Sequence, residues 1–572
     1  MSKFKFFSVA FLAMGYTAVA QDVEAAKKAI DAEQFEKAKS ILKSVIKAKP
    51  DNGRAVFLLG NVYLQQTYQD SAKAAFQSGI TLKEAGLLNY IGLGQIDLDN
   101  GNASAAQFNF DQALKEVTKK NVEPQVYVGK AFTKSEKPDA KKAIEVLLKA
   151  KAVSPNDAQL QMALGDAYYL DVIQNKSTTS QNEAYAAYRN AVTNDASLVR
   201  AKMQQSVLLK GARAYQQAKE GLDQIIAANP TYGPAYRELA ETYLGMALSQ
   251  NDKAKFKEYT EKALPLYEKY MSLTDYSLAS RMRHADFLII TQDYKALEKE
   301  AEEMKKLDKV NPRILRYLGY AAYENGNIDN SIDVLNQYVG NSSNKIIGRD
   351  YLYLGLGQIK KAVVPAATAT DKPKVDDALF DAAIANFKKA VDLDKPMAND
   401  LNEIGKGLFD QKLYKQAAAV YEVAVGNPNS KNYLYDNFYL GFALYFQNTG
   451  LKAGEKVNVE ELKKADAALA IVLEKSATTQ EAHIYRARVN SLIDTDPTAQ
   501  AQMAKSYEDY INVVTAKGEA EVAKSKAKFI EAYQNLALYN KKDKVKATDY
   551  INKALAIDPA DADSLKIKAA LK

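Results

Sequence analysis

The chain has 572 residues, of which 47% are hydrophobic and 26% are charged, and its formal net charge is +7. This length is too great for one compact core, so several domains or a repeat array are required, and the hydrophobic content excludes a disordered chain. Charges of both signs are interspersed, which is typical of a solvated surface rather than of a nucleic-acid-binding face. The absence of cysteine excludes disulfides, thiolate metal ligands and cysteine nucleophiles.

Residues 1–20 have the pattern of a signal peptide. A basic start precedes an apolar stretch, and Ala18 and Ala20 are the small residues of a cleavage site. The apolar stretch is short for a bilayer span, and no later segment has a long uncharged apolar run. We therefore expect cleavage after Ala20, a periplasmic or secreted location, and no transmembrane span.

Residues 54–82 contain two short amphipathic patterns separated by a turn. The first pattern has Leu59-Gly60 followed by Tyr63, and the second has Ala72 and Phe76. The spacing of apolar residues in each pattern predicts a helix, and a small residue is needed where two such helices cross closely. The segment therefore predicts a pair of packed helices.

The same skeleton recurs along the chain. Twelve residues separate Gly60 from Ala72, and the same interval separates Gly94 from Ala106 and Ala131 from Ala143. The small residues on successive first helices are Gly60, Gly94, Ala131, Gly165, Ser206, Ala240, Ala285, Gly319, Gly357, Gly405, Gly441, Ala487 and Ala537. Self-similarity at a fixed period indicates a solenoid of stacked helix pairs.

This pattern resembles the tetratricopeptide repeat family, whose unit has Leu-Gly and Tyr on its first helix and Ala, Phe and Ala on its second. The resemblance implies an all-α, right-handed superhelical solenoid of about fourteen helix pairs. The eighth unit, 281–304, matches the pattern weakly, as do the last two. A break in the spacing at 340–348 divides the array into residues 21–340 and 341–572, and the second part is expected to end in a capping helix.

Four units have additional residues between their two helices. These residues are largely polar, and two prolines interrupt the third stretch, so we predict loops there and no sheet. The four stretches are 173–182, 247–257, 361–377 and 447–461.

No catalytic or cofactor-binding constellation is found in the sequence. His284 and His483 are the only histidines and lie far apart, so they cannot form the usual histidine-rich metal or proton-relay sites. The resembled family includes members that bind C-terminal carboxylates through Lys and Asn at set places on the first helices. Asn61 occupies one such place, but Phe57 stands where the lysine is required. Because Phe57 replaces this lysine, we do not expect that carboxylate-binding function.

The lack of a catalytic or cofactor-binding constellation predicts no enzyme activity, no cofactor and no metal.

The concave side of such a solenoid is lined by first helices, and one of them carries a surplus of aromatic residues. Residues that stand three before, one after and four after the small residue share one helix face. Around Gly441 this face carries four aromatic side chains, which are Tyr435, Phe438, Phe442 and Tyr445. We predict that they bind a partner, although packing on neighbouring repeats is an open alternative.

A second candidate partner site lies on the first helix that contains Gly319. It consists of Arg313, Arg316 and Tyr320, residue types that are common in the energetically dominant part of protein interfaces. The open alternative is that these side chains form salt bridges within the solenoid.

The leading hypothesis for function is an exported scaffold that mediates protein–protein interactions in a bacterial cell-envelope complex. Secretion, outer-membrane assembly or uptake are the processes considered, with a protein or peptide held in the concave groove and association with an outer-membrane complex. The alternative is an envelope protein that binds glycan or peptidoglycan on its tyrosine-rich faces. Nucleic acid is not expected as a partner.

Overall fold

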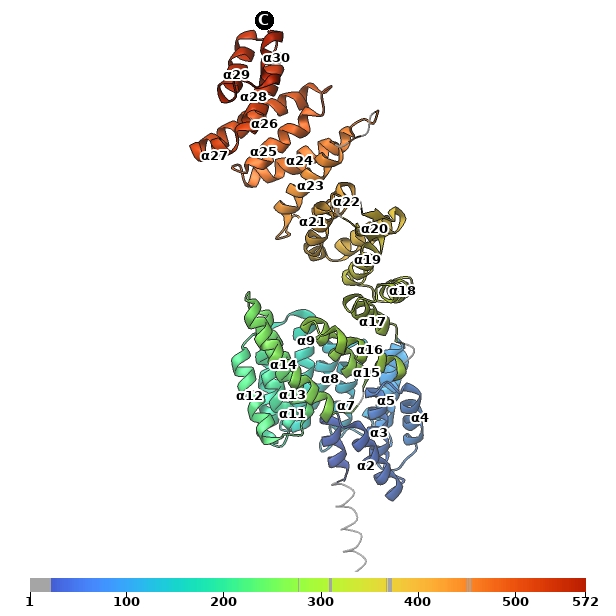
Figure 1. The fold of residues 1–572 in the computed structure, drawn as a ribbon. Coiled ribbons are helices and arrows are strands. Elements are labelled where there is room, and N and C mark those ends of the chain that lie inside the picture. Colours follow the sequence, from blue (N-terminus) through green and yellow to red (C-terminus); the bar gives the residue numbers. More distant parts are fainter. Residues whose placement is uncertain are drawn as a thin grey trace, which may run out of the picture. The chain divides into compact units, whose positions relative to one another are not determined.

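The computed structural model describes residues 22–275, 277–307, 311–366, 368, 373–449, 451 and 454–571, so the predicted signal peptide lies outside the described residues. The described chain consists mainly of helices, and within each unit most helices pack against the next one in the sequence (Figure 1). The predicted all-α solenoid is confirmed. The helices form two compact units, one up to Asp293 and the other from Tyr294 onward.

The described part of the N-terminal unit begins with a helix over residues 22–31. Its other helices are α2 (Phe35–Ala48), α3 (Gly53–Gln65), α4 (Gln69–Gly79), α5 (Leu88–Asp99), α6 (Ala103–Leu114), α7 (Glu123–Lys134), α8 (Ala140–Val153), α9 (Ala158–Asn175), α10 (Thr178–Asn194), α11 (Val199–Gly211), α12 (Tyr215–Ala228), α13 (Gly233–Leu248), α14 (Lys253–Leu273) and α15 (Leu278–Thr291).

The C-terminal unit also contains one short 3₁₀ helix and one pair of two-residue strands. Its elements are α16 (Tyr294–Leu307), α17 (Arg313–Glu324), α18 (Ile328–Val339), α19 (Gly348–Ala362), β1 (Val363–Val364), β2 (Lys374–Val375), α20 (Asp377–Leu393), η1 (Lys395–Asp400), α21 (Asn402–Asp410), α22 (Tyr414–Ala424), α23 (Tyr433–Gln447), α24 (Val459–Lys475), α25 (Gln480–Ser491), α26 (Pro497–Ala516), α27 (Glu519–Lys524), α28 (Lys526–Tyr539), α29 (Lys544–Ile557) and α30 (Ala562–Leu571).

The two compact units divide between Asp293 and Tyr294, inside the eighth repeat, whose match to the repeat pattern is weak. The division of the repeat array at residue 340 stays a prediction. The expected C-terminal capping helix is α30, which packs on α28 and α29.

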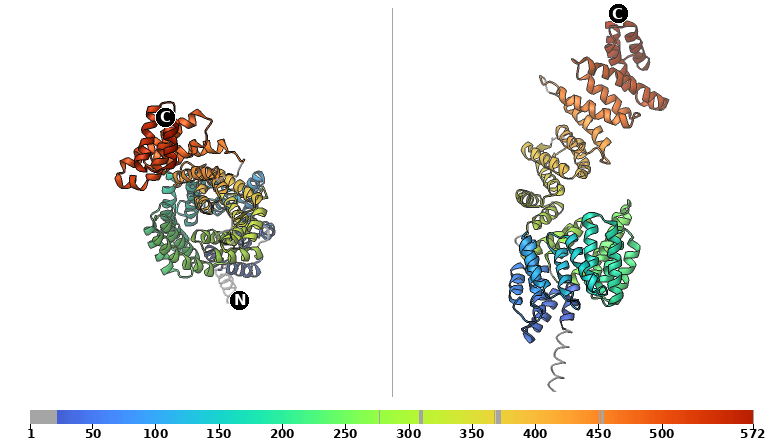
Figure 2. Two further views of the ribbon diagram at one scale, coloured as in Figure 1. Left: turned by 45° about the horizontal axis from the view of Figure 1, so that its top comes forward. Right: turned by 180° about the vertical axis from the view of Figure 1, so that it is seen from behind.

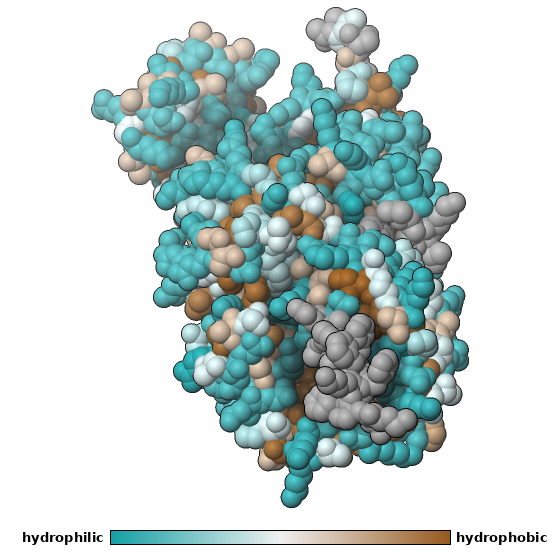
Figure 3. Space-filling model, turned by 90° about the horizontal axis from the view of Figure 1, so that it is seen from below, coloured by the Kyte–Doolittle hydropathy of each residue, from teal (hydrophilic) through white to brown (hydrophobic). Residues whose placement is uncertain are grey.

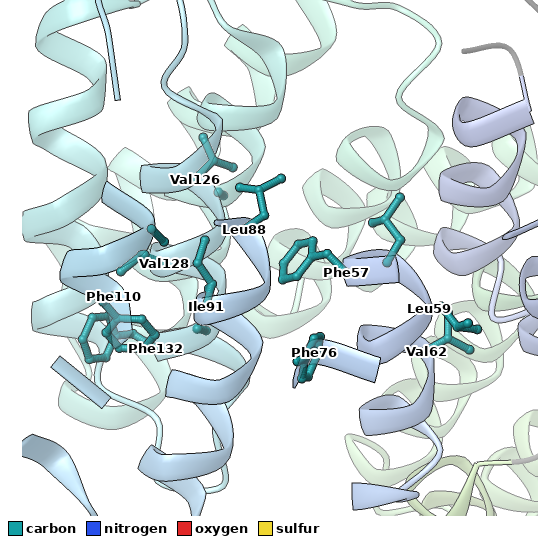
Figure 4. Packing of buried hydrophobic residues seen from close by; sticks show 14 of the residues in the cluster. Phe57, Leu59, Val62, Phe76, Leu88, Ile91, Phe110, Val126, Val128 and Phe132 are labelled. Carbon is teal, nitrogen blue, oxygen red and sulfur yellow. The ribbon is translucent and has the colours of Figure 1, made fainter. Parts of the chain in front are cut away.

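Close crossing of the two helices in each pair explains the small residues. A Cβ atom added at Gly60 would lie 2.2 Å from Cε1 of Phe76, and one added at Gly92 of the next repeat would meet the same ring at 2.3 Å. In Figure 4 the Phe76 side chain lies among the core residues, and Phe110 lies beside Phe132, with ring centroids 5.2 Å apart. Each large second-helix side chain therefore fills the space that the small residues leave open.

Replacing Gly94 with leucine should destabilise its repeat by about 1–3 kcal/mol through overpacking. The physical reason is that a Cβ atom added at Gly94 would lie 2.5 Å from Cε1 of Phe110, which is buried. Hydrogen exchange of α5 and α6 measures the effect locally. The matched control is Gly407→Leu on α21, because no atom lies within 4 Å of a Cβ added there. Unchanged exchange in α5 and α6 would show that the crossing is not tight.

Two of the four predicted loops are instead extensions of helices. Residues 173–182 form the end of α9 and the start of α10, and only Lys176 and Ser177 lie between them. Lys176 has φ of 55°, which turns the chain, and the Ser177 side chain accepts a hydrogen bond from the backbone N–H of Ser180 and caps α10. Similarly, Asp252 caps α14, so most of 247–257 is helical. Polar residues on an exposed helix face resemble a loop in composition, which explains the difference.

The other two stretches contain connections between helices. In 361–377, β1 pairs with β2 in antiparallel register, Val363 opposite Val375, which is a short ribbon that the sequence did not predict. In 447–461, α23 ends at Gln447 and α24 begins at Val459. The predicted loop is therefore confirmed for the described residues between these two helices.

The N-terminal unit closes on itself, because the turn after its first helix contacts α13 and α14 (Figure 2). Arg237 on α13 donates to Glu33 at 2.7 Å, and the hydroxyl of Tyr270 on α14 donates to the other carboxylate oxygen of Glu33 at 2.6 Å. The backbone N–H of Asp275 donates to the carbonyl of Glu33 at 2.9 Å. Ala32 is buried in one apolar cluster with Leu222 and other residues of α11–α13. Repeats about two hundred positions apart are thus in direct contact.

Within the described part of the chain, no helix is long and apolar enough to cross a membrane. The face drawn in Figure 3 is predominantly hydrophilic, and its apolar residues are scattered in small groups. Such a surface is typical of a solvated protein face.

Candidate interaction surfaces

The predicted aromatic face on α23 is partly accessible. Tyr435 is 38% exposed, and Phe438, Phe442 and Tyr445 are half-buried. The rings of Phe438 and Phe442 lie 4.3 Å apart between centroids. These four residues are called the α23 aromatic face below. Full burial, which would have assigned them to the core alone, is not observed.

Three further aromatic residues belong to the same cluster, and the sequence analysis did not identify them. Tyr485 on α25 lies 4.0 Å from Phe442 and 5.3 Å from Tyr445 between ring centroids. Tyr439 and Phe446 also contact members of the face. Tyr439 and Tyr485 each stand two positions before a small residue of the repeat, Gly441 and Ala487. This shared register is the sequence signal that could have identified Tyr439 and Tyr485.

The second predicted face is mostly directed into the protein. Arg316 is buried and donates from Nε to Asp350 Oδ1 at 2.7 Å and from Nη2 to Asp350 Oδ2 at 2.8 Å. Tyr320 is 1% exposed, donates to Asp350 Oδ1 at 2.7 Å and stacks on Tyr353. The salt bridge within the solenoid, which the sequence left open as an alternative, is therefore what forms. The physical reason is that Asp350 lies on the next first helix and offers both residues a buried charged partner.

Arg313 is half-buried on α17 and is also engaged within its own helix. It donates to the Tyr317 hydroxyl at 2.8 Å, and its guanidinium lies 5.7 Å from the centre of that ring. With Arg316 and Tyr320 occupied by Asp350, this face offers a partner little that is free to bind. The α23 aromatic face is the better supported of the two predicted surfaces.

A polar cavity of about 470 Å³ lies inside the N-terminal unit. The residues that line it come from the turn after the first helix and from α7, α9, α11, α13 and α15. They include Asp31, Glu33, Lys134, Tyr169, Arg200, Gln204, Lys210, Tyr232, Arg237, Glu238, Glu241 and Arg283. This cavity is called the lumen below, and the sequence analysis did not identify it because its wall is assembled from repeats that are distant in the chain.

Most charges of the lumen are held in ion pairs. Lys210 contacts Glu238 at 2.6 Å and Glu241 at 2.5 Å, and Arg237 contacts Glu238 at 2.9 Å. Burial alone would raise the pKa of Glu238, but the charges of Lys210 and Arg237 outweigh it and lower the pKa to about 2. Likewise, burial would raise the pKa of Glu33, but Arg237 and the Tyr270 hydroxyl hold it below its usual value.

A second cavity, of about 560 Å³, lies where α12, α13 and α14 meet. Three half-buried tyrosines contribute to it, Tyr215, Tyr243 and Tyr259, together with Lys219 and Lys262. The rings of Tyr243 and Tyr259 are 6.3 Å apart between centroids. The cavity therefore combines aromatic faces with hydrogen-bonding groups.

The part of the chain that the structure describes contains no group of three or more His, Asp or Glu side chains that could hold a metal ion. His284 stacks on Tyr267 with ring centroids 5.1 Å apart, and His483 is buried and bonds the carbonyl of Ala477 at 2.8 Å. Both histidines are thus packing residues.

Stacked helix pairs that present accessible side-chain faces define a helical repeat solenoid, a class of protein built to offer extended binding surfaces. Residues 23–85 match the family model of the tetratricopeptide repeat. This stretch therefore carries tetratricopeptide-repeat sequence, and such repeats serve as scaffolds for protein–protein interaction and are typically not catalytic. A search of curated proteins finds no match to the chain.

Several solved structures are similar to this chain. The C-terminal part of a tetratricopeptide-repeat protein of Cytophaga hutchinsonii is 25% identical, the match covers 50% of this chain and 98% of that one, and the TM-score is 0.28. A thermophilic tetratricopeptide-repeat protein of Thermus thermophilus is 22% identical, with 36% and 99% covered and a TM-score of 0.29. Human IFIT1, solved as a dimer with PPP-AAAA, is 16% identical, with 56% and 72% covered and a TM-score of 0.35.

Proposed function

We propose that this protein is an exported scaffold of a bacterial cell envelope and that it docks a protein partner on the α23 aromatic face. The observation that carries the proposal is the surplus of aromatic side chains on that face. Leu440, Leu444 and Leu469 are buried and already fill the interior of this repeat, yet Tyr435 remains 38% exposed beside three half-buried rings. Proteins rarely expose contiguous apolar patches, and such patches often mark interaction sites.

The chemistry of the face suits an apolar segment of a partner protein. Tyr and Phe supply large contact areas at low conformational cost, and tyrosine hydroxyls add hydrogen bonds at the edge. Arg488 lies 4.9 Å from the centre of the Tyr485 ring and donates to Glu531 at 2.8 and 2.6 Å, which provides a charged rim beside the rings. A helix or loop with several apolar side chains fits this arrangement.

Export and an envelope location form the second part of the proposal. Residues 1–20 supply its support, because they combine a basic start, a short apolar stretch and small residues at a cleavage site. The lack of cysteine agrees with an oxidising compartment, where a free thiol is a liability.

The experiment is co-purification from the cell envelope with mass spectrometry of the partners and of the protein's own N-terminus. Tyr435→Ser with Phe438→Ser should reduce partner recovery by about tenfold or more, because central aromatic residues dominate interface energies. Phe442 packs on Tyr485, so Phe442→Ser would also cost stability, and we leave it unchanged in the test variant.

The matched control is Phe108→Ser, which removes a 62% exposed aromatic residue from α6. It should leave both recovery and thermal stability unchanged. Recovery of every partner by a folded Tyr435→Ser, Phe438→Ser variant would place the binding site elsewhere. A mature protein that retains residues 1–20 would contradict export through cleavage.

Glycan binding is the second candidate, and the tyrosine-lined cavity at α12–α14 favours it. Sugars stack on aromatic faces while their hydroxyls bond to nearby polar groups, and this cavity offers both through Tyr215, Tyr243 and Tyr259. A polysaccharide or peptidoglycan pull-down separates the two candidates. Retention that Tyr259→Ala abolishes would favour the glycan, and retention of proteins alone would favour the scaffold.

A further inference from the structure

Asp436 on α23 takes part in a bridge between first helices that lacks an arginine. On α17, Arg316 stands three positions before the small residue of its repeat and binds Asp350, which follows 34 positions later. On α21, Asn402 stands at the same place in its repeat and binds Asp436, again 34 positions later. The equivalent bridge therefore has a neutral amide where the other bridge has a guanidinium. A local departure from the pattern that a fold requires often marks a functional position.

The carboxylate of Asp436 is fully buried and has one hydrogen-bond partner among the described residues. Asn402 Nδ2 donates to its Oδ1 at 2.6 Å, whereas its Oδ2 accepts no hydrogen bond. The buried carboxylate of Asp350, by comparison, accepts four hydrogen bonds, two of them from Arg316. A buried carboxylate that has neither a cation nor a full set of donors is unfavourable in its charged form.

Among the described residues, the helices packed against α23 bring no cation to Asp436. Lys406 on α21 is bound to a carboxylate of its own helix at 2.6 Å, and the lysines of α22 and α24 are exposed. Arg486 and Arg488 on α25 each donate two hydrogen bonds to a carboxylate of another helix. His483 on α25 bonds a backbone carbonyl. The positive charges around Asp436 are therefore either committed elsewhere or at the surface.

The electrostatics of the site agree with this geometry. Burial raises the pKa of Asp436 from its usual 3.8 to about 6, and the hydrogen bond from Asn402 offsets only part of this effect. No charged residue of the described chain shifts this pKa. The titratable group that faces Asp436 from α22 is Tyr421, which is buried and whose hydroxyl also lacks a partner among the described residues. Burial, followed by neighbours that include Asp436, raises the pKa of Tyr421, so this hydroxyl stays uncharged.

The α23 aromatic face lies next to this carboxylate and rests on the same helices. Tyr435 directly precedes Asp436 in the chain, and its ring lies 4.5 Å from that of Tyr439 between centroids. The Tyr439 ring lies 5.1 Å from the ring of Phe409 on α21 and 6.0 Å from that of Tyr421 on α22. The start of α23 packs on both of these helices (Figure 1). Loosening this packing would therefore displace the rings of the face.

We propose that Asp436 is a pH-sensitive joint: when uncharged it lets the start of α23 pack on α21 and α22, and when charged it loosens this packing and the α23 aromatic face. Because burial disfavours the charge, the packed repeat binds the proton more tightly than the opened repeat does. The packing is therefore most stable in acid, and this stability is lost as the pH rises from 3.8 to about 6. The control of partner binding rests on the proposed docking at this face, whereas the joint itself does not.

The test of the joint is hydrogen exchange of the full chain at pH 5 and pH 7.5, without a partner and corrected for intrinsic exchange rates. The equilibrium constant for opening α21–α23 should rise about tenfold between these two values, which is the change that linkage predicts for this carboxyl group. The segment α17–α19 is an internal control in the same sample, because Asp350 there is paired with Arg316. Its opening constant should change by less than about twofold.

Two variants remove the uncompensated charge in different ways. Asp436→Asn keeps the size of the side chain and an acceptor for Asn402, and Asn402→Arg places a guanidinium opposite Asp436, as in the bridge from Arg316 to Asp350. Either variant should abolish the tenfold rise. The matched control is Asp410→Asn, an exposed carboxylate on α21, and it should retain the rise. A rise of less than about twofold in the unaltered protein, or an equal rise in Asp436→Asn, would overturn the joint.

Partner recovery from the cell envelope at pH 5.5 and pH 7.5 tests whether the joint controls docking. The unaltered protein should recover about threefold more partner at pH 5.5, because a larger fraction of it has an ordered face, and Asp436→Asn should recover equal amounts at both values. Equal recovery by the unaltered protein would overturn this control of docking. Exchange is measured without a partner, so a failure of the docking proposal itself, seen with Tyr435→Ser and Phe438→Ser, leaves the result for the joint unaffected.

Discussion

Replacing Asp350 with alanine should destabilise the segment from α17 to α19 by about 3–5 kcal/mol, because it leaves the buried guanidinium of Arg316 without its charge partner. The carboxylate is fully buried and accepts four hydrogen bonds, two from Arg316, one from Tyr320 and one from the backbone N–H of Ile347. The last of these caps the start of α19. The Asp350 side chain therefore connects two successive repeats and also caps the N-terminus of α19.

Hydrogen exchange of α17, α18 and α19 is the appropriate measurement, since long repeat arrays do not unfold in one two-state transition. Tyr320→Phe removes only one of the four bonds and should cost about 1 kcal/mol. The matched control is Asp329→Ala, whose carboxylate pairs with Lys361 at the surface, and it should leave exchange unchanged. If Asp350→Ala had no more effect than this control, the network would not stabilise the array.

Replacing Arg237 with alanine should open the contact between the start of the N-terminal unit and α13, at a cost of about 3–5 kcal/mol. Its side chain is 8% exposed and bridges Glu33 and Glu238, so its loss leaves the buried carboxylate of Glu238 and the half-buried carboxylate of Glu33 with fewer partners. Hydrogen exchange should accelerate in residues 22–48 while α5 and α6 remain protected. Lys219→Ala, which removes a surface pair with Asp223, is the control and should have no such effect.

The contact of Arg237 with Glu33 and Glu238 should weaken at acidic pH. The pKa of Glu33 is held below its usual value, and that of Glu238 lies at about 2. Groups with a lowered pKa stabilise the folded state above their unfolded pKa of about 4.5, and this stabilisation is lost as the pH falls toward the folded pKa. Exchange in residues 22–48 should therefore rise between about pH 4.5 and 2 in the unaltered protein. In Arg237→Ala this pH dependence should be reduced, and an equal dependence would exclude the pair as its source.

The helix pairs were predictable because the constraints that define them are local. The interval from Gly60 to Ala72 places a small residue opposite a close crossing, and the Phe76 ring fills the remaining space. The ends of α9 and α10 were not predictable from composition, because polar residues suit an exposed helix face as well as a loop. The residue that indicates a helix start in this stretch is Ser177, whose side chain caps α10.

The inward direction of Arg316 could have been predicted from spacing. Arg316 and Asp350 are 34 positions apart, as are Asp166 and Arg200, so opposite charges one repeat apart indicate a bridge between first helices. The lumen has no such signal. The cavity forms because each repeat is slightly rotated relative to the previous one, and the accumulated rotation brings Glu33 into contact with Arg237. No local sequence pattern specifies this total rotation.

The closure between Glu33 and Arg237 also restricts how the N-terminal unit can evolve. An open solenoid tolerates duplication or loss of a repeat, because each repeat touches only its neighbours. Here one additional helix pair between residues 33 and 237 would carry Arg237 past Glu33, and one fewer would stop short of it, in both cases removing the contact with Tyr270 as well. The repeat number of this stretch is therefore fixed by geometry, in the way that the number of blades is fixed in a closed propeller.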